Sequence, residues 1–338
     1  MDTTAKEITF DENGVCSFCH SAQQALKEIK EDRNKLSGII DRIKLNGKGK
    51  KYDCLIGLSG GVDSSTVLHN AIRLGLRPLC FSLDNGWNTH KADKNIERLV
   101  RITKVPYEVI KIDLQKYGEL QGAFFDGGIK NIEAVTDHIL FAVTYDIANK
   151  NNIKWILSGG NEETESVMPS SWGEDARDLK WIKAIYKKMT GKRLKGLPTI
   201  SLWKEQYYRL IKGVKFCRLL NYSSYDREKY IELLKSKYMY KPYGDKHCES
   251  KFTMWFQNYF LLEKYGIDKR KAHFSSLINS GQMTRDEALK LLENKPSYPN
   301  IGLDMLIRTP KKEYEDYKNS KLGRKIVVLL YKISKIWR

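Results

Sequence analysis

The sequence predicts an α/β fold: a doubly wound parallel sheet with a mostly helical C-terminal region and a small N-terminal cysteine knuckle. Between residues 51 and 165, short apolar runs alternate with segments of helical periodicity, which is typical of a parallel sheet covered by helices. Beyond residue 165 the segments become longer, basic and aromatic, with helical spacing. We therefore expect three parts, spanning residues 1–50, 51–165 and 166–338.

Each expected element follows from an apolar run or a periodic stripe. Buried strands are expected at 54–58, 76–83, 107–112 and 155–157. Helices are expected at 21–44, 64–74, 91–103, 136–149, 176–189, 202–212, 227–237, 252–265 and 286–293. A polar Gly/Lys segment, 46–51, separates the first helix from the sheet.

The bulk composition excludes some classes of protein and leaves others open. No run of about 18 apolar residues occurs, so no membrane-spanning helix is expected. The first residues lack a basic and then apolar signal, so we expect a cytoplasmic protein. The net charge of +18 suits nucleic acid, anionic small molecules or an anionic membrane surface. Lysines spread over solvated faces explain the charge equally well.

The C-terminal stretch, 322–338, is amphipathic and basic. Such a segment can lie on an anionic membrane surface or dock on a partner. Packing of a terminal helix on its own domain is the simpler interpretation.

A cysteine pair marks the N-terminal part. Cys16 and Cys19 follow a turn in the order C-x-x-C-H, which is similar to one half of a zinc site. No second C-x-x-C occurs in the sequence. The remaining ligands would have to come from His247 and Cys248, or from His20. A pair of thiols without metal is an equally simple interpretation.

A glycine-rich loop follows the first expected strand, with the sequence SGGVDSS at 59–65. It lacks the lysine of a Walker loop and the spacing of a dinucleotide fingerprint. Gly60 and Gly61 allow backbone N–H groups to approach an anion, and Asp63 suggests a magnesium ion beside the phosphates. The loop therefore predicts a pyrophosphate cradle. Its hydroxyl donors would be Ser59, Ser64 and Ser65.

Two further strand ends carry polar residues. Asp84 and Asn85 follow the second strand, and the fourth strand ends in Ser158, Gly159, Gly160 and Asn161. Because the carboxyl ends of parallel strands share one edge of a sheet, these motifs are expected beside the glycine loop.

Four acidic or basic residues near these strand ends have two interpretations each. Glu162 and Glu165 are candidates for magnesium binding or for deprotonating an amine, or they mark a charged helix start. Asp137 and His138 open a helix, where capping or substrate contact is expected.

SGGVDS resembles the pyrophosphate loop of the PP-loop ATP pyrophosphatase superfamily, whose fold is of the adenine nucleotide alpha hydrolase type. Over nearly the full length the chain is also similar to the N-acetyl sugar amidotransferases. The stretches that carry this resemblance include FDENGVCSFC, SLDNGWN, TDHILFA, ILSGGNEETES, YRLIKG, LLNY and GIDKRKAHFSSLINSGQMTRDEAL.

This resemblance implies an ATP-dependent ligase that adenylates a sugar N-acetyl oxygen, releases AMP and pyrophosphate, and forms an acetamidino sugar for lipopolysaccharide, O-antigen or flagellin glycans. It implies ATP and Mg²⁺. Residues 59–65 would hold the β- and γ-phosphates, Asp84 and Asn85 would lie near the adenosine, and residues 158–161 would face the α-phosphate and the acetamide. The catalytic residues implied are Asp63, Ser64, Asn161 and Glu165.

The resemblance also implies partners. No cysteine here has the context of a glutaminase nucleophile, so ammonia is expected from a separate glutaminase and a cyclase-like channel protein, and no nucleic acid is expected. The substrate would be a nucleotide-linked or sialic-acid-like acetamido sugar in a basic pocket. Relatives typically carry another C-x-x-C ahead of the residues that correspond to 1–3, so zinc binding stays open.

Two other functions remain. A PP-loop RNA-modifying enzyme of the tRNA-thiolation type suits the positive charge and the aromatic content. However, Cys54 and Cys80 lie within strands, where they are poorly placed for sulfur transfer. A non-catalytic scaffold that binds nucleotide is the third hypothesis, and the presence of Asp63 argues against it.

Overall fold

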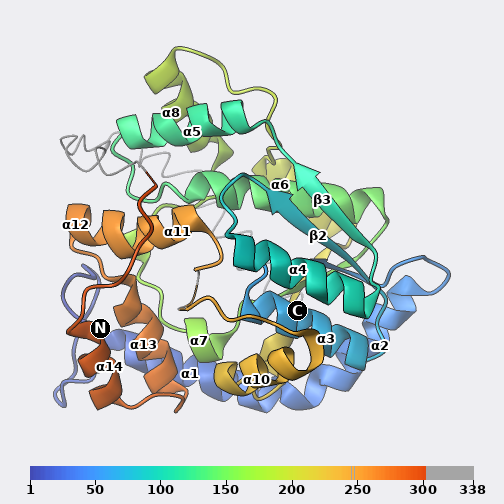
Figure 1. Cartoon of the computed structure of the whole chain (residues 1–338), viewed down its shortest axis with the longest axis horizontal. Helices are drawn as coiled ribbons and strands as arrows, with labels where there is room; N and C mark the ends of the chain where they lie inside the picture. The colour runs from blue at the N-terminus through green and yellow to red at the C-terminus, as the bar shows by residue number, and fades with distance from the viewer. Residues whose placement is uncertain (245, 247, 302–338) are drawn as a thin grey trace.

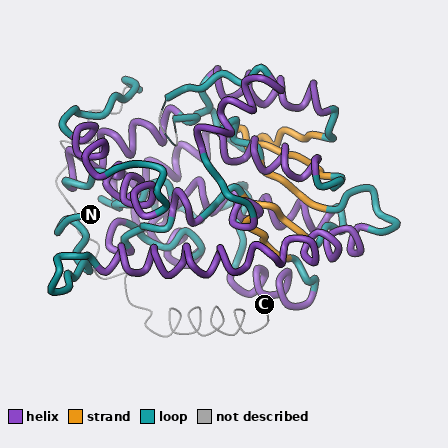
Figure 2. Tube along the Cα trace, turned by 90° about the horizontal axis from the view of Figure 1, so that it is seen from below, coloured by secondary structure: helices purple, strands orange, loops and turns teal. Residues whose placement is uncertain are grey.

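The computed structural model describes residues 1–244, 246 and 248–301 (Figure 1). At its centre lies a five-stranded sheet whose neighbouring strands all pair in parallel, in the order β3-β2-β1-β4-β5. The strands are β1 (Cys54–Gly57), β2 (Pro78–Asp84), β3 (Tyr107–Lys111), β4 (Trp155–Ser158) and β5 (Lys215–Arg218). In Figure 2 the strands occupy one half of the molecule between layers of helices, and the other half is helical.

The α-helices up to the end of the fourth strand are α1 (Ser17–Asp32), α2 (Leu36–Gly47), α3 (Val62–Arg73), α4 (His90–Thr103), α5 (Leu114–Asp126) and α6 (Ala134–Lys150). Those after it are α7 (Glu162–Glu165), α8 (Leu179–Thr190), α9 (Leu202–Gln206), α10 (Arg227–Tyr238), α11 (Lys251–Trp255), α12 (Leu261–Tyr265), α13 (Lys269–Asn279) and α14 (Arg285–Leu292). Short 3-10 turns are η1 (Arg33–Lys35), η2 (Ser170–Trp172) and η4 (Leu219–Tyr222), and π turns are η3 (Tyr207–Ile211) and η5 (Phe256–Phe260).

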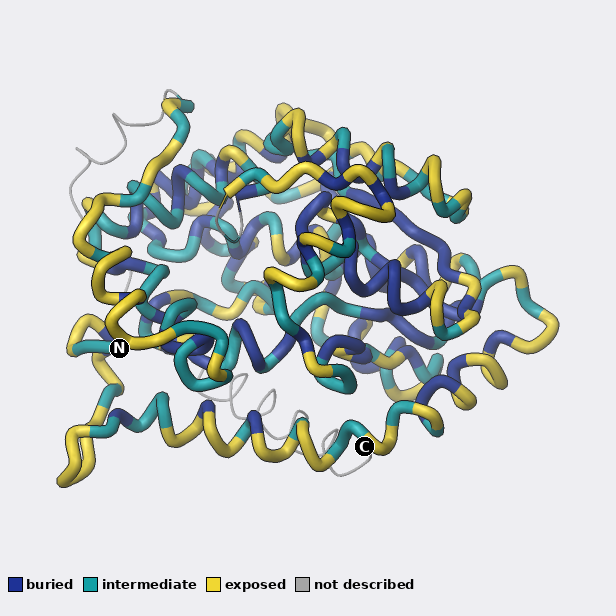
Figure 3. Tube along the Cα trace, turned by 60° about the horizontal axis from the view of Figure 1, so that its bottom comes forward, coloured by how far each residue is buried: buried dark blue, intermediate teal, exposed yellow. Residues whose placement is uncertain are grey.

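Alternate residues of the three central strands, β1, β2 and β4, bury into two separate cores. Leu55 faces the core built with α5 and α6, whereas its neighbours Cys54 and Ile56 face the core built with α2, α3, α4 and α10. This alternation is the period-two pattern of a strand buried on both faces. Figure 3 shows the buried residues concentrated in and around the sheet. The predicted doubly wound parallel sheet is therefore confirmed.

The strand order reverses between β1 and β4. From β1 the chain runs outward through β2 to β3, and it then returns to β4 on the other side of β1. The loops after β1 and β4 therefore begin side by side, and such a switch point is where open α/β sheets bind ligands. The glycine loop at 59–65 and the turn at 158–161 both lie at this position.

Three elements escaped the sequence prediction. β5 is a four-residue edge strand in which only Cys217 is buried, too short for a recognisable pattern. It lies in the segment expected to be helical, so that region contributes one strand to the sheet. Neither α5 nor α13 was among the expected helices. The expected helix at 21–44 is instead two helices joined by η1.

None of the helices within the described part of the chain is long and apolar enough to cross a membrane. The basic stretch at 322–338 lies outside the described residues.

Candidate active site

The glycine loop turns sharply into α3. Gly60 has a left-handed φ of 79°, and a Cβ there would lie 2.4 Å from the carbonyl oxygen of Ala92 on α4. The amide of Gly61 donates to Ser59 Oγ at 3.1 Å, and Ser65 Oγ donates to the Gly61 carbonyl at 2.7 Å. Glycine is therefore required at position 60 by both conformation and space.

Gly61 is the N-cap of α3, and no side chain caps that helix end. By contrast, side chains cap α4, α5 and α7. The first-turn N–H groups of α3 have no partner within the helix, and they carry its positive end. The loop thus presents uncapped donors at the switch point, as an anion site does.

Asp63, in the first turn of α3, is surrounded by polar partners from distant segments. Tyr225 donates its hydroxyl to Asp63 Oδ1. Lys246 Nζ lies 3.4 Å from Asp63 Oδ2 and 2.8 Å from Glu165 Oε1, and it donates to Thr164 Oγ1 at 2.6 Å. A single buried ammonium group thus joins two of the predicted catalytic carboxylates.

The charges around Lys246 determine its protonation. Burial alone would lower the pKa of Lys246, but the neighbouring charges of Asp63 and Glu165 outweigh that effect and raise it. Burial, and then the charge of Asp63, raises the pKa of Tyr225. The lysine is therefore a permanent cation, and the tyrosine is a neutral donor.

The turn after β4 packs directly against the loop. A Cβ on Gly159 would lie 3.1 Å from the backbone carbon of Asp63. Asn161 is buried and caps α7, where its Oδ1 accepts from the amide of Thr164 at 2.9 Å. The amide of Gly160 donates to Ser158 Oγ at 3.2 Å. The side chain of Asn161 is therefore engaged in holding α7, and its catalytic role stays a prediction.

The second strand end contributes one residue to the same region. Asn85 lines the cavity described next and lies 3.5 Å from the Tyr117 hydroxyl, to which its Nδ2 donates. Asp84 ends β2 and accepts from the amide of Gly86 at 3.3 Å. Their predicted contact with adenosine stays a prediction.

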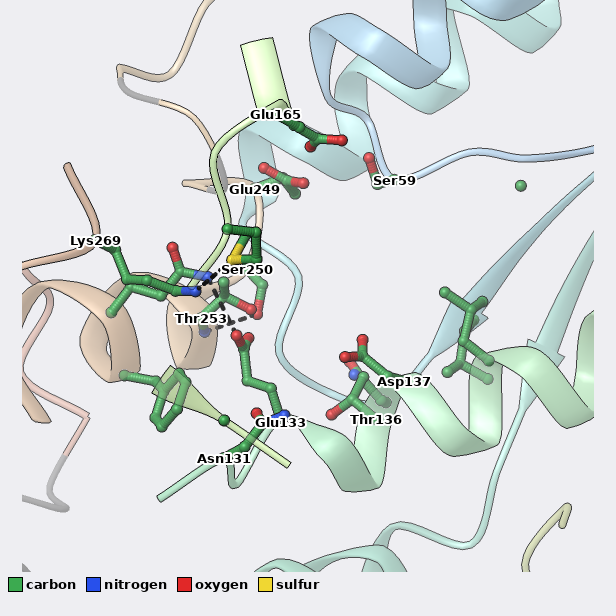
Figure 4. A pocket seen from close by; sticks show the side chains of 18 of the residues that line it. Ser59, Asn131, Glu133, Thr136, Asp137, Glu165, Glu249, Ser250, Thr253 and Lys269 are labelled. Atoms are coloured by element: carbon green, nitrogen blue, oxygen red, sulfur yellow. Dashed lines mark hydrogen bonds between the residues drawn. The ribbon is translucent and has the colours of Figure 1, made fainter. Parts of the chain in front are cut away.

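A cavity of about 870 Å³ extends from the glycine loop into the helical C-terminal region. Near one end lie Ser59, Glu165 and Glu249 (Figure 4). Farther in, the walls come from the start of α6, the segment after α7, α11 with η5, and the start of α13. The volume matches that of sites for small molecules.

Carboxylates dominate the charges that line this cavity. They are Glu133, Asp137, Glu165, Glu174, Asp175 and Glu249, and the lining cations are Arg218 and Lys269. The expectation of a basic pocket was therefore wrong: the net charge of +18 resides on other surfaces of the chain. Overall charge reports composition, whereas a cavity's charge depends on which few side chains the fold turns inward.

Two charged side chains far from the loop face each other across the cavity (Figure 4). Asp137, in the first turn of α6, is surrounded by protein but open to the cavity, and it has no hydrogen-bond or ion-pair partner among the described residues. Lys269, at the start of α13, donates to Met168 Sδ at 3.2 Å and lies 5.8 Å from the ring centre of Trp172. Neighbouring Glu133 accepts from Gln257 Nε2 at 3.2 Å.

The pKa values of this pair shift in opposite directions. Burial, followed by the charge of Glu133, raises the pKa of Asp137 to about 7, while Lys269 partly opposes the rise. Burial lowers the pKa of Lys269 against the attraction of Glu133 and Asp137. Such perturbed groups in a cavity are candidates for proton transfer. Of the two interpretations of Asp137, helix capping and substrate contact, these shifts favour substrate contact.

The predicted metal ligands do not assemble. Cys16 Sγ lies 3.4 Å from Cys19 Sγ, but within the described ranges no three His, Cys, Asp or Glu side chains gather as a metal site requires. Cys248 therefore does not join the pair, and His247 lies outside the described residues. His20 contacts Asp11 at 2.8 Å instead.

Sequence reasoning missed four residues of the site: Lys246, Tyr225, Glu133 and Lys269. Lys246 and Tyr225 come from segments far from the loop, and no local pattern identified them. Lys269 lies in the stretch GIDKRKAHF, within the resemblance but not singled out. Glu133 lies four residues before Asp137, a spacing that places two carboxylates on one side of a helix start.

Several known proteins are similar to this chain. Residues 249–304 match the family described as LPS biosynthesis protein WbpG-like, C-terminal domain. The uncharacterized protein MJ1599 of Methanocaldococcus jannaschii is 22% identical over 302 residues, which are 88% of this chain and 91% of that protein. An NH(3)-dependent NAD(+) synthetase of Halobacterium salinarum is 26% identical over 199 residues, 53% of this chain and 71% of that enzyme.

Similar solved structures include the predicted subunit of tRNA methyltransferase from Methanocaldococcus jannaschii, with a TM-score of 0.34, 14% identity and coverage of 64% of this chain and 90% of that one. Another is NMN synthetase from Francisella tularensis, with a TM-score of 0.30, 17% identity and coverage of 68% and 92%.

The matched C-terminal domain supplies one wall of the cavity, including Glu249, Thr253 and Lys269, and the glycine loop supplies the opposite end. Residues 249–304 thus carry the likeness to the C-terminal domain of the WbpG-like lipopolysaccharide biosynthesis proteins, and this match supports the family that the sequence indicated.

Proposed function

We propose that the protein is an ATP-dependent amidotransferase that adenylates the N-acetyl oxygen of a sugar and replaces that oxygen with the nitrogen of ammonia. The product would be an acetamidino sugar for lipopolysaccharide O-antigen or another surface glycan. One observation carries the proposal: a single cavity joins the glycine loop to the WbpG-like domain, so a nucleotide and a second substrate can meet within it.

The loop end fits the triphosphate of ATP. The uncapped start of α3 offers N–H donors, and a Cβ at Gly60 or Gly61 would fill space within 3 Å of neighbouring atoms. Asp63 and Glu165 would supply carboxylate oxygens to Mg²⁺, which usually completes its shell with phosphate oxygens and water. Lys246 would add a cation beside the pyrophosphate that departs.

The carboxylates of the cavity suit the proposed product. An acetamide is neutral, whereas an amidine is protonated at neutral pH, so the reaction generates a positive charge at the reacting carbon. A cavity lined by Glu133, Asp137 and further carboxylates stabilises that charge as it develops. Formation of a positively charged amidine therefore agrees with the negative lining of the cavity, although the chain as a whole is positively charged.

Ammonia would come from a separate glutaminase through a cyclase-like channel protein. Five of the cysteines, Cys16, Cys54, Cys80, Cys217 and Cys248, are buried, and burial raises the pKa of Cys54 and Cys80. Neither property suits a glutamine-cleaving nucleophile. We expect product with ammonium salts, and product with glutamine only when the partner proteins are added.

The RNA-modifying alternative has less support. Sulfur transfer needs an accessible thiolate, whereas Cys54 and Cys80 are buried in β1 and β2 and burial raises the pKa of both thiols. Recovery of thiolated RNA would restore that alternative.

The test supplies the purified chain with ATP, MgCl₂, ammonium chloride and a panel of acetamido sugars, and analyses the products by mass spectrometry. We expect a sugar lighter by about one dalton, because NH replaces O, with AMP and pyrophosphate formed in equal amounts. Omission of ammonium should stop the sugar product. Formation of ADP, or no change in any sugar, would contradict the proposal.

A further inference from the structure

We propose that Glu133 and Asp137 form the nitrogen subsite of the cavity, which binds the incoming ammonium ion, takes its proton and afterwards holds the amidinium group of the product. This inference rests on the proposed function for its chemistry, but its cation-binding part can be tested without any reaction.

The position of Asp137 is the first reason. Its carboxylate is surrounded by protein, opens into the cavity and has no partner within the described part of the chain. Because Asp137 is accessible from the cavity, its carboxylate oxygens can accept hydrogen bonds from a ligand that enters it. The missing partner must be a hydrogen-bond donor, and a cation fits best.

The neighbours of Asp137 define the charge of the subsite. Glu133 comes from the same helix, Lys269 faces both carboxylates from α13, and Glu165 on α7 acts on Lys269 in turn. With all groups ionised, Glu133, Asp137 and Lys269 together carry one negative charge. A monovalent cation therefore neutralises the subsite, whereas a neutral molecule or a phosphate would not.

The proton balance also fits. Ammonium is not a nucleophile until it loses a proton, and Asp137, whose pKa is raised to about 7, can accept one near neutral pH. The nitrogen lone pair then forms a C–N bond to the neutral imidate. The C–O bond to AMP breaks, and its electron pair leaves with the AMP oxygen. The amidine retains the positive charge, and Asp137 returns its proton to water.

Direct binding provides the first test. Acetamidinium chloride and acetamide have nearly the same shape, but only the former is charged and resembles the product. Ligand-observed NMR on the full chain should show acetamidinium binding about tenfold more tightly than acetamide. Asp137→Asn should abolish this preference, while Asp146→Asn, an exposed position on the same helix paired with Lys204, should keep it. Equal binding of both molecules by the unmodified protein would overturn the subsite.

Kinetics provide the second test. In Asp137→Asn, kcat/KM for ammonium should fall about 100-fold, and its rise through pH 7 should disappear. Pyrophosphate release upon sugar adenylation should stay nearly unchanged. An unaltered pH profile would refute proton transfer to Asp137. If acetamidinium preference is found but no sugar is ever amidated, the cation subsite stands and the proposed function fails.

Discussion

The two ends of the cavity are built in opposite ways. At the loop end, Ser59, Ser64 and Asp63 are hydrogen-bonded or paired within the chain, and the uncapped donors are backbone amides of α3. At the inner end, Asp137 lacks a partner among the described residues, and Lys269 donates its hydrogen bond to a thioether. The loop end is thus a rigid backbone cradle, whereas the inner end is a set of charges that a substrate would complete.

This difference explains what each end demands of the sequence. A backbone cradle needs glycines and small hydroxyl residues in a contiguous order, so it leaves a recognisable string. A charge cluster needs only that separate segments meet, and here α6 and α13 lie more than 100 positions apart in the chain. The backbone cradle can therefore be predicted from the local sequence, whereas the charge cluster depends on the tertiary fold.

The largest effect is expected from Asp63→Asn at the loop end. The substitution keeps the shape but removes the charge that faces Lys246 and, in our proposal, Mg²⁺. Pyrophosphate release should fall at least about 100-fold. Without the Asp63 carboxylate, Mg²⁺ would be held less well beside the phosphates and would stabilise less of the negative charge on the departing pyrophosphate. Steady-state pyrophosphate assays would measure this. Full activity in the variant would show that the loop serves only as a scaffold, the third hypothesis raised by the sequence.

The sequence was sufficient for four of the five strands, the switch-point loops and the positions of Ser59 and Gly60. Each of these follows from apolar runs and turn residues close together in the chain. The sequence was not sufficient for the charge of the cavity, because 59 basic residues against 41 acidic ones suggested a basic pocket. Lys246 and Tyr225 were missed since nothing in their local sequence reports a contact with Asp63. β5 was missed because four residues carry too little pattern.

A second prediction concerns the ammonium group that joins the two carboxylates. Lys246→Met leaves Asp63 and Glu165 facing each other without a cation, and should lower the free energy of unfolding by about 3 kcal/mol. Urea denaturation would measure the loss, and added Mg²⁺ should restore part of it. Lys35→Met, at a surface pair with Asp32, is the matched control and should change stability by less than about 1 kcal/mol. Equal losses in both variants would show that Lys246 is an ordinary surface charge.

A third prediction separates the cost of backbone strain from the cost of steric contact at the glycine loop. Gly60 and Gly213 both have left-handed φ angles, of 79° and 66°, but only at Gly60 would a Cβ meet another atom. Gly213→Ala should cost about 1 kcal/mol from backbone strain alone. Gly60→Ala should cost about 2 kcal/mol or more, because strain adds to the contact with Ala92. Comparable melting temperatures for the two variants would mean that the close approach of α4 to the loop is not a constraint.

The smallest effect is expected at the inner end, and its sign distinguishes the two ends. Burial and Glu133 raise the pKa of Asp137 to about 7, well above its value in an unfolded chain. For a carboxyl group with a raised pKa, ionisation opposes folding, so its contribution to stability declines as pH rises from about 4 to 7. Asp137→Asn should therefore raise the melting temperature at pH 8 and leave it almost unchanged at pH 4. Thermal denaturation at both pH values, with Asp146→Asn, a position paired with Lys204 on the same helix, as the control, would measure this. A variant less stable than the unmodified protein at pH 8 would show that Asp137 has a structural partner after all, and the inner end would then resemble the loop end.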